Sequence, residues 1–219
     1  MKAIRFSAAL ALMFLFLTAI VSAQDRVDVY FGMGTARTSS HDFTDPTTGN
    51  TVAGTALGGV FGTVGGGVFL KPTYGVGAQV SWRFAQEQLN NSSSFSSTGA
   101  TNLGFRPIFY DFNALWTPLP KGKRVMPEFQ AGFGGASLRL YDPSAQYYNY
   151  QTGRYTNFVG SSNHLQLHVA GGVRFFVKPH LFVRPGIDFH WVRNLSDQLG
   201  TNNVPEYTIA IGYSSRQSR

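Results

Sequence analysis

One segment alternates apolar with small or polar residues over a length that strongly constrains the fold. In residues 74–84, every second residue is apolar or aromatic, and the residues between them are Gly, Gln, Ser and Arg. This period of two is typical of a β-strand with one apolar face. Strands in soluble proteins usually have about five or six residues, whereas a tilted strand needs about 9–11 to cross a bilayer. The segment therefore predicts a membrane-crossing β-strand.

The same alternation recurs along the chain. It is regular in five further segments, at residues 27–33, 108–116, 165–175, 183–191 and 207–213. It is less regular over 57–69 and over 125–140, where Leu138 and Leu140 break the parity of the preceding residues. Together with residues 74–84, these segments predict eight strands.

The connections between the segments alternate in length. Three of them are short, at residues 70–73, 117–124 and 178–180. The four that intervene are long and polar, at residues 38–54, 87–102, 141–163 and 194–205. Short turns at one end and long loops at the other are typical of outer-membrane barrels, whose turns are periplasmic. An even number of strands then places both chain termini on the turn side.

Composition supports a barrel that closes within a bilayer. Charged residues make up only 13% of the chain and hydrophobic residues 43%, whereas ordinary soluble domains have about 25% charged residues. A soluble lipocalin-type barrel would turn its charges outward and its apolar residues inward, so the low charge disfavours that alternative. Without Cys, a disulfide framework, a Cys-ligated zinc site and a Cys nucleophile are excluded. We predict an all-β fold, an eight-stranded antiparallel up-and-down transmembrane β-barrel.

The first 23 residues predict a cleaved secretory signal peptide. Lys2 and Arg5 precede an apolar run over residues 8–21, and Val-Ser-Ala at 21–23 has the small residues that signal peptidase requires. The run is shorter than the roughly 20 residues of a spanning helix, which disfavours an N-terminal anchor. The expected organisation is a signal peptide at 1–23, the barrel at 24–213 and a short periplasmic tail at 214–219.

The signal peptide, the eight alternating segments and the final strand at 207–213 resemble the small outer membrane beta-barrel superfamily. That superfamily includes the transmembrane domains of outer membrane proteins A and X. The resemblance covers residues 24–213 and implies a location in the outer membrane of a Gram-negative-type bacterium, with both termini periplasmic. It implies outer-membrane lipids and lipopolysaccharide as neighbours, and periplasmic chaperones and the barrel-assembly machinery during biogenesis. A monomer is expected, with no cofactor and no nucleic-acid partner.

Charged residues of inward parity form the first group of candidate site residues. An eight-stranded barrel leaves room inside only for side chains, and a buried charge without a partner is costly. We predict that Glu128 accepts hydrogen bonds from Arg174 or Arg184, and that Asp111 or Asp188 completes the contacts. The predicted interior ionic network comprises Arg83, Asp111, Glu128, Arg174, Arg184, Asp188, His190 and Glu206.

Two histidines fall at similar height on adjacent predicted strands. They are His168 and His190, and Asp188 and Glu206 are possible further metal ligands. Zinc sites normally have three or four protein ligands, so a histidine pair predicts hydrogen-bonded interior side chains rather than a metal site. The lipid A deacylase barrels carry His and Ser two residues apart, a pattern that His190 and Ser196 resemble only faintly. No metal ligand and no catalytic residue are therefore expected.

Two aromatic groups complete the candidate residues. Rings near the ends of lipid-facing runs are predicted to form membrane girdles, at Tyr74, Trp82, Trp116, Trp191 and Tyr213. Five tyrosines crowd into fifteen residues of one long connection, at Tyr141, Tyr147, Tyr148, Tyr150 and Tyr155. Tyrosine is enriched at recognition surfaces, so this loop is predicted to bind a partner. The alternative is a loop folded over the barrel mouth or resting on lipopolysaccharide.

Three functions from different classes stay open at this point. The favoured one is a non-enzymatic outer-membrane barrel with a structural role in the envelope and with surface loops for interaction or adhesion. The second is a narrow, porin-like pore for small solutes. The third is a lipid-modifying barrel enzyme such as a lipid A deacylase.

Overall fold

The computed structural model covers the barrel and part of its connections. It describes residues 26–38, 42–44, 49, 51–52, 55–88, 103–118, 124–143, 146–150 and 153–215. The predicted signal peptide and residues 216–219 of the predicted tail lie outside the described residues.

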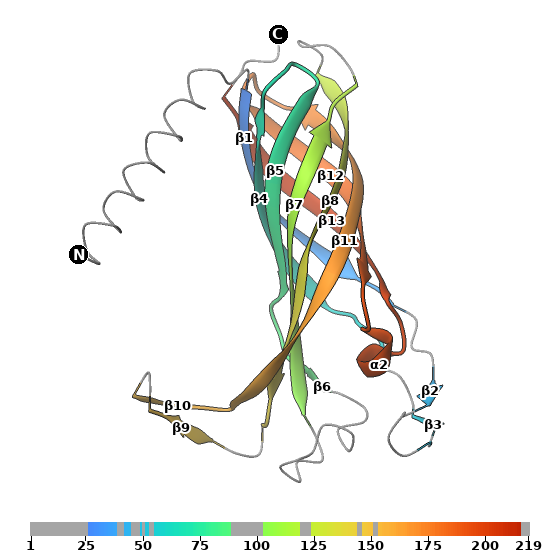
Figure 1. Ribbon diagram of the computed structural model, residues 1–219. Helices are drawn as coiled ribbons and strands as arrows, with labels where there is room; N and C mark the ends of the chain where they lie inside the picture. The colour runs from blue at the N-terminus through green and yellow to red at the C-terminus, as the bar shows by residue number, and fades with distance from the viewer. Residues whose placement is uncertain are drawn as a thin grey trace, which may run out of the picture.

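Eight long strands form one closed antiparallel barrel (Figure 1). In chain order they are β1 (Arg26–Ala36), β4 (Val60–Phe69), β5 (Tyr74–Arg83), β7 (Gly104–Trp116), β8 (Val125–Tyr141), β11 (Phe158–Phe176), β12 (Leu181–Val192) and β13 (Asn203–Ser214). Each strand pairs with the next, and β1 pairs with β13, so these eight strands leave no open edge. The predicted eight-stranded up-and-down barrel is confirmed. Closure pairs the backbone groups that an open sheet would expose to lipid.

Short elements lie at the loop end of the barrel, away from the C-terminus (Figure 1). They are β2 (Phe43–Thr44), β3 (Thr51–Val52), β6 (Glu87–Gln88), β9 (Tyr147–Asn149), β10 (Arg154–Thr156) and α2 (Ser196–Leu199). Two pairs of them form hairpins, β2–β3 and β9–β10, while β6 pairs with the start of β7. Among the described residues, no helix is long and apolar enough to cross a membrane.

The two faces of the wall alternate as the sequence predicts. On β5, Val76 and Val80 are exposed on the outer face while Gln79 is buried in the interior. On β13, Ile209 and Ile211 are about two-thirds exposed. A continuous apolar outer face of this kind is what a lipid-facing band requires.

The loop end of β8 differs from the expectation. Leu138 and Leu140 keep the inward parity of Glu128, and both are buried. The strand therefore does not lose its alternation. The interior itself changes from polar to apolar at that height, so apolar residues appear on the inward side of the strand.

β11 begins earlier than predicted, at Phe158 instead of residue 165, while β8 ends only one residue later than predicted, at Tyr141. The two strands are paired from Val125–Phe175 as far as Tyr141–Phe158, so the expected loop over 141–163 shrinks to 142–157. The outer part of β11 is rich in Ser, Asn and Gly, and it carries no apolar alternation that sequence analysis can detect. Backbone pairing with β8 keeps it extended.

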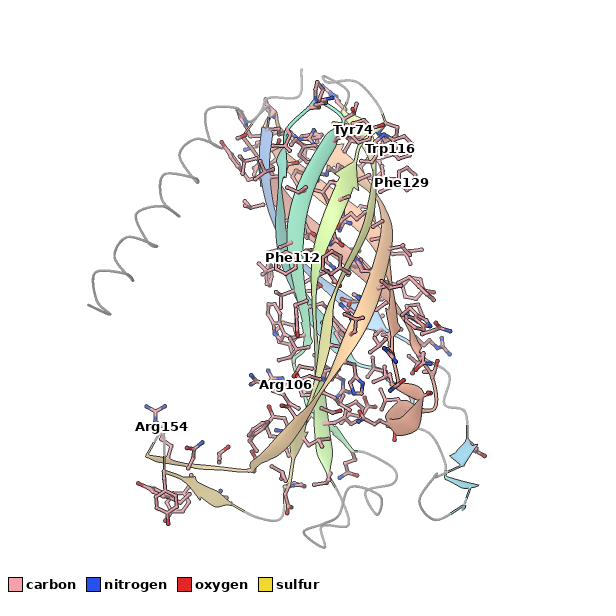
Figure 2. The ribbon with its side chains drawn as sticks, in the orientation of Figure 1. Tyr74, Arg106, Phe112, Trp116, Phe129 and Arg154 are labelled. Atoms are coloured by element: carbon pink, nitrogen blue, oxygen red, sulfur yellow. The ribbon has the colours of Figure 1, made fainter. Side chains whose placement is uncertain are left out.

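The predicted girdle residues lie at two levels. At the turn end, Tyr74 pairs with Trp116 across β5 and β7, and the Trp116 ring lies 5.5 Å from Phe129 (Figure 2). Tyr213 lies at the same end, opposite Leu181 at the start of β12. The other two predicted residues, Trp82 and Trp191, lie near the loop ends of β5 and β12. Two aromatic belts are typical of a barrel at its two membrane interfaces.

Candidate functional site

The inward-facing side chains of β12 run through the interior layer by layer. From the turn end they are Phe182, Arg184, Asp188, His190 and Val192, all of them buried. We name four layers after them. They are the aromatic floor at Phe182, the arginine layer at Arg184, the histidine–carboxylate layer at Asp188 and His190, and the apolar cap at Val192. The interior is therefore filled by side chains along its length, as expected for eight strands.

The arginine layer is centred on Glu128, which has no solvent exposure. Arg174 donates to one carboxylate oxygen of Glu128, and Arg184 Nε lies 2.9 Å from the other. Arg174 also donates to Asp28 Oδ2, and Arg26 Nε lies 2.9 Å from that same oxygen. Three guanidiniums and two carboxylates thus neutralise most of one another's charge within a single layer.

Asp28 occupies the place that was expected for Asp111 or Asp188. It lies on β1, across the barrel from Arg174 on β11, and 146 residues separate the two in sequence. In the sequence, only the inward parity of Asp28 near the turn end indicates that it could join the arginine layer. Contacts across the interior depend on how the barrel closes, which strand alternation does not reveal.

Aromatic rings lie against the guanidiniums of the arginine layer. The contacts from guanidinium carbon to ring centroid are Arg26–Phe69 at 3.6 Å, Arg174–Phe182 at 4.8 Å and Arg184–Tyr30 at 5.2 Å. Cation–π contacts of this kind are stronger when the cation is desolvated. The aromatic floor therefore both closes the turn end and supports the buried cations.

The histidine–carboxylate layer is built on a directly paired couple of histidines. His168 on β11 and His190 on β12 are register partners, and their rings stack with centroids 4.8 Å apart. The Phe109 ring stacks on the ring of His190, with their centroids 4.7 Å apart. The imidazole rings are therefore held in place by aromatic packing.

Asp188 faces the Nε2 side of His168. Its Oδ1 lies 3.3 Å from His168 Nε2 and accepts a hydrogen bond of 2.9 Å from Gln79. Its Oδ2 accepts a bond of 3.1 Å from the Thr208 hydroxyl.

Glu206 faces the Nε2 side of His190 in the same manner. Its Oε2 lies 3.7 Å from His190 Nε2. The hydroxyls of Ser81 and Thr63 donate to the Glu206 carboxylate, at 2.7 and 3.1 Å respectively. Neutral donors thus hold this carboxylate in position.

Asp111 faces the Nδ1 side of both rings. Its Oδ2 lies 3.8 Å from His190 Nδ1 and 3.9 Å from His168 Nδ1, while Gln166 donates to its other oxygen. Asn113 Oδ1 lies 2.9 Å from His168 Nδ1. Among the described residues, Asp111 Oδ2 and both ring nitrogens of His190 have no hydrogen-bond partner.

Arg83 lies apart from the other predicted network residues. Its Nη2 lies 3.1 Å from Glu87 Oε2, and its guanidinium donates to the main-chain oxygens of Gly58 and Ala85. It is the last residue of β5, above the histidine–carboxylate layer, so it binds connections at the loop end.

The apolar cap closes the loop end of the interior. Its buried members are Ala36, Leu57, Phe61, Phe105, Phe109, Ala136, Leu138, Leu140, Val192, Leu195, Leu199 and Val204. Leu199 comes from α2, so the short helix packs onto the end of the barrel. A polar solute would have to displace both this cluster and the paired charges below it.

We expect the barrel to be closed to ions at rest. The purified protein should give no steady single-channel conductance in planar lipid bilayers, because the apolar cap and the arginine layer both fill the interior. A preparation that migrates anomalously when unheated provides the control for folding. Stable open channels of uniform size would contradict the closed interior and favour the pore.

The β9–β10 hairpin carries exposed aromatic rings. The Tyr148 ring lies 5.0 Å from that of Tyr150 and 5.3 Å from that of Tyr155, in both cases edge to face. Tyr150 is 90% exposed and Tyr155 71%. Tyr141 differs from the prediction, since it is buried at the end of β8. The side chain of Tyr147 lies outside the described residues.

A groove of about 560 Å³ lies beside this hairpin. Its lining residues are Arg139, Tyr141, Asn149, Arg154, Tyr155, Thr156 and Phe158. Figure 2 shows Arg154 at the far end of the hairpin. Two arginines and three aromatic residues therefore line one groove, and no carboxylate is among the described residues that line it.

A serine–histidine contact on β11 was missed in the sequence. Ser162 Oγ lies 2.8 Å from His164 Nε2, two residues away. His164 Nδ1 lies 3.0 Å from the main-chain oxygen of Arg193, and Gln198 donates to Ser162 Oγ. In the sequence, this contact is indicated only by a Ser and a His that lie two residues apart. No carboxylate orients the imidazole among these contacts.

Comparison with solved structures supports the fold. Neisserial surface protein A is 13% identical to this chain, and the match covers 87% of this chain and 96% of that one with a TM-score of 0.50. The outer membrane protein OprG from Pseudomonas aeruginosa is 11% identical, with coverages of 87% and 96% and a TM-score of 0.49. The outer membrane enzyme PagL is 12% identical, with coverages of 84% and 97% and a TM-score of 0.39. A shared fold does not by itself decide function.

Sequence comparison identifies the family. A search of curated proteins finds no significant match. The outer membrane protein beta-barrel domain, in contrast, matches over residues 7–216, which is nearly the whole chain. With its closed eight-stranded barrel and its apolar outer face, this chain belongs to the outer membrane protein beta-barrel domain family.

Proposed function

We propose that the protein is a non-enzymatic outer-membrane barrel that binds an anionic polysaccharide at the cell surface through its β9–β10 hairpin. The supporting observation is the exposed tyrosine cluster of this hairpin beside the groove that contains Arg139 and Arg154. Large rings left in solvent at the end of a rigid scaffold are typical of binding surfaces rather than of packing.

The residues of the groove favour an anionic sugar polymer as the ligand. Guanidinium groups bind carboxylate, sulfate and phosphate oxygens through paired hydrogen bonds. Tyrosine rings offer flat apolar faces with a hydroxyl at the rim, which suits the mixed surface of a sugar ring. Arg154, Tyr155 and Asn149 place both kinds of group on one hairpin.

The proposed orientation places the hairpin outside the cell. It lies at the opposite end of the barrel from the start of β1 and the end of β13 (Figure 1). With both termini periplasmic, as in our prediction, the long connections then face the lipopolysaccharide leaflet and the medium. The barrel wall contributes to the envelope as a monomer in outer-membrane lipid, and the assembly machinery and chaperones act during its biogenesis.

The test is a triple substitution of the hairpin tyrosines, Tyr148→Ser, Tyr150→Ser and Tyr155→Ser. Binding to immobilised lipopolysaccharide and to an immobilised sulfated polysaccharide should weaken about tenfold or more, because exposed tyrosines often dominate the binding energy. Comparing binding to the two immobilised ligands shows whether the ligand is the cell's own glycolipid or a foreign polymer.

A deletion of residues 92–97, in another long connection, is the matched control. Both variants should still migrate anomalously when unheated, which shows that the barrel folds. If the deletion abolishes binding and the tyrosine variant binds like the wild type, the binding loop is not the hairpin. If neither variant has an effect, the protein is a structural barrel without this ligand.

A lipid-modifying enzyme is the second candidate, and the contact between Ser162 and His164 is the observation that favours it. A hydroxyl within hydrogen-bond distance of an imidazole is the first requirement of a serine nucleophile. The imidazole faces a main-chain carbonyl rather than a carboxylate, so the arrangement lacks the third member of a triad. Lipid A mass spectra from cells that express the wild type or Ser162→Ala test this candidate.

A further inference from the structure

We propose that the histidine–carboxylate layer is a structural site for one divalent transition-metal ion of the zinc class. The ligands would be Asp111 on β7, His168 on β11 and His190 on β12, whose ligand atoms lie within 4.8 Å of one another. The sequence placed two histidines at one height, with Asp188 and Glu206 as the possible further ligands. The barrel adds a carboxylate from a third strand on the same side of both rings.

The distances between the ligand atoms fit a zinc ion. Asp111 Oδ2 lies 3.8 Å from His190 Nδ1 and 3.9 Å from His168 Nδ1. Tetrahedral zinc with bonds of about 2.0–2.2 Å separates its ligands by about 3.4 Å. The carboxylate is therefore within about 0.5 Å of the required distance from each imidazole, and the two stacked imidazoles would turn toward each other to bind the same ion. Asn113 Oδ1 accepts a hydrogen bond of 2.9 Å from His168 Nδ1, so a bound ion would replace that proton and could take the amide oxygen as its fourth ligand.

The polar atoms left over in this layer point to the same site. Asp111 Oδ2 and His190 Nδ1 are buried and have no hydrogen-bond partner among the described residues. His190 itself has no solvent exposure. A buried polar atom without a partner is destabilising, and a bound ion would satisfy both atoms.

The outer nitrogens of the two rings face carboxylates. His168 Nε2 lies 3.3 Å from Asp188, and His190 Nε2 lies 3.7 Å from Glu206. Metal-binding histidines almost always donate their other ring N–H to a carboxylate, a carbonyl or a water, which fixes the tautomer that leaves the ligating nitrogen bare. His168 has that arrangement, and His190 has a carboxylate on the matching side, at a distance too long for a hydrogen bond.

Charge favours a cation in the same place. The layer contains three carboxylates, those of Asp111, Asp188 and Glu206. Apart from His168 at Asp188, their hydrogen-bond donors are neutral Gln, Ser and Thr side chains. Among the described residues, no Arg or Lys forms an ion pair with any of the three. Buried charge without compensation is strongly destabilising, and a divalent ion would offset most of it.

The position in the barrel gives the ion a structural role. Its ligands come from β7, β11 and β12, and Glu206 adds β13 through His190. The arginine layer lies on one side of the site and the apolar cap on the other. An ion would therefore enter as the strands close, so that metal binding is coupled to folding.

The experiment loads the metal during folding. Untagged protein, unfolded in urea, is refolded into detergent micelles with Zn²⁺ or with a chelator, passed over a chelating resin and analysed by elemental mass spectrometry. Protein folded with Zn²⁺ should retain about one zinc per chain and unfold at a higher temperature than protein folded with the chelator. Mg²⁺ and Ca²⁺, which prefer oxygen ligands, should not be retained.

Two single substitutions make the test specific. Asp111→Asn preserves the size of the side chain and the oxygen that accepts from Gln166, so the barrel should fold while retained zinc falls at least tenfold. Mutation of the supporting shell alone typically costs about 10–100-fold in metal affinity. His164→Gln is the matched control, because His164 lies on the same strand as His168 but outside the site. It should retain as much zinc as the wild type.

Two outcomes would overturn the proposal. If wild-type protein folded with Zn²⁺ retains no more metal than Asp111→Asn, the layer is a hydrogen-bonded network that is neutralised by protonated imidazoles. If His164→Gln loses the metal and Asp111→Asn retains it, zinc binds near the loop end and not in the interior.

Discussion

Replacing Arg174 by alanine is expected to lower the free energy of unfolding by about 3–5 kcal/mol. Arg174 donates hydrogen bonds to both Glu128 and Asp28, and all three side chains are almost completely buried. Its removal leaves two carboxylates in the interior with only Arg26 and Arg184 to compensate them. The loss is a large part of the roughly 5–15 kcal/mol that stabilises most folded domains.

Urea unfolding in lipid or detergent micelles, followed by tryptophan fluorescence and by migration of unheated protein, measures this effect. Arg193→Ala is the control, because Arg193 is exposed just beyond the end of β12. Exposed substitutions of this kind usually change stability by no more than about 0.5 kcal/mol. Equal effects of the two substitutions would show that Arg174 does not hold buried carboxylates together.

Phe109→Ala is expected to destabilise the barrel by about 3–5 kcal/mol. Phe109 is 1% exposed and lies in the apolar cap, with its ring 6.3 Å from Phe61 and 4.7 Å from His190. Truncation removes this packing and leaves a cavity that the surrounding strands cannot fill, because their backbones are fixed by the ladder of hydrogen bonds.

Phe112→Ala on the same strand is the matched comparison. Phe112 faces outward and is 62% exposed to the lipid side (Figure 2). Lipid chains occupy the space that its ring vacates, so no cavity forms. The substitution then loses only the free energy of transferring the ring out of water, about 1.5–3 kcal/mol. Urea unfolding of both variants should rank Phe109→Ala as the more destabilised. The reverse order would mean that the cap does not pack as the structure has it.

The wall of the barrel was predictable residue by residue in the six regularly alternating strands, but not over 57–69 and 125–140. Val76, Val80 and Ile209 face outward as their parity indicates, and Gln79 faces inward. Alternation predicts the direction of each side chain because a strand in a closed barrel has only two environments, lipid on one side and the interior on the other. The first residues of β11 escaped prediction because 158–164 lack apolar alternation, and their pairing with β8 keeps them extended.

The candidate site was predictable only in part. The contacts of Glu128 with Arg174 and Arg184 join β8, β11 and β12, which are consecutive in the barrel, so parity and height were sufficient. Asp28 joins them from across the interior. Arg83 shares the inward parity of the network, yet it lies above the polar layers and binds Glu87 and main-chain oxygens instead.

The amino-acid sequence by itself determined the number of strands, the face each one turns to lipid and the end at which the long connections lie. These properties are local, because each depends only on residues two apart along one strand or on the length of one link. Tertiary structure alone decided which inward side chains meet. The closing pair β1–β13 and the stagger of the strands bring Asp28 to Arg174, and Asp111 to the two histidines. Such contacts join residues more than fifty positions apart, and no pattern along a single strand records them.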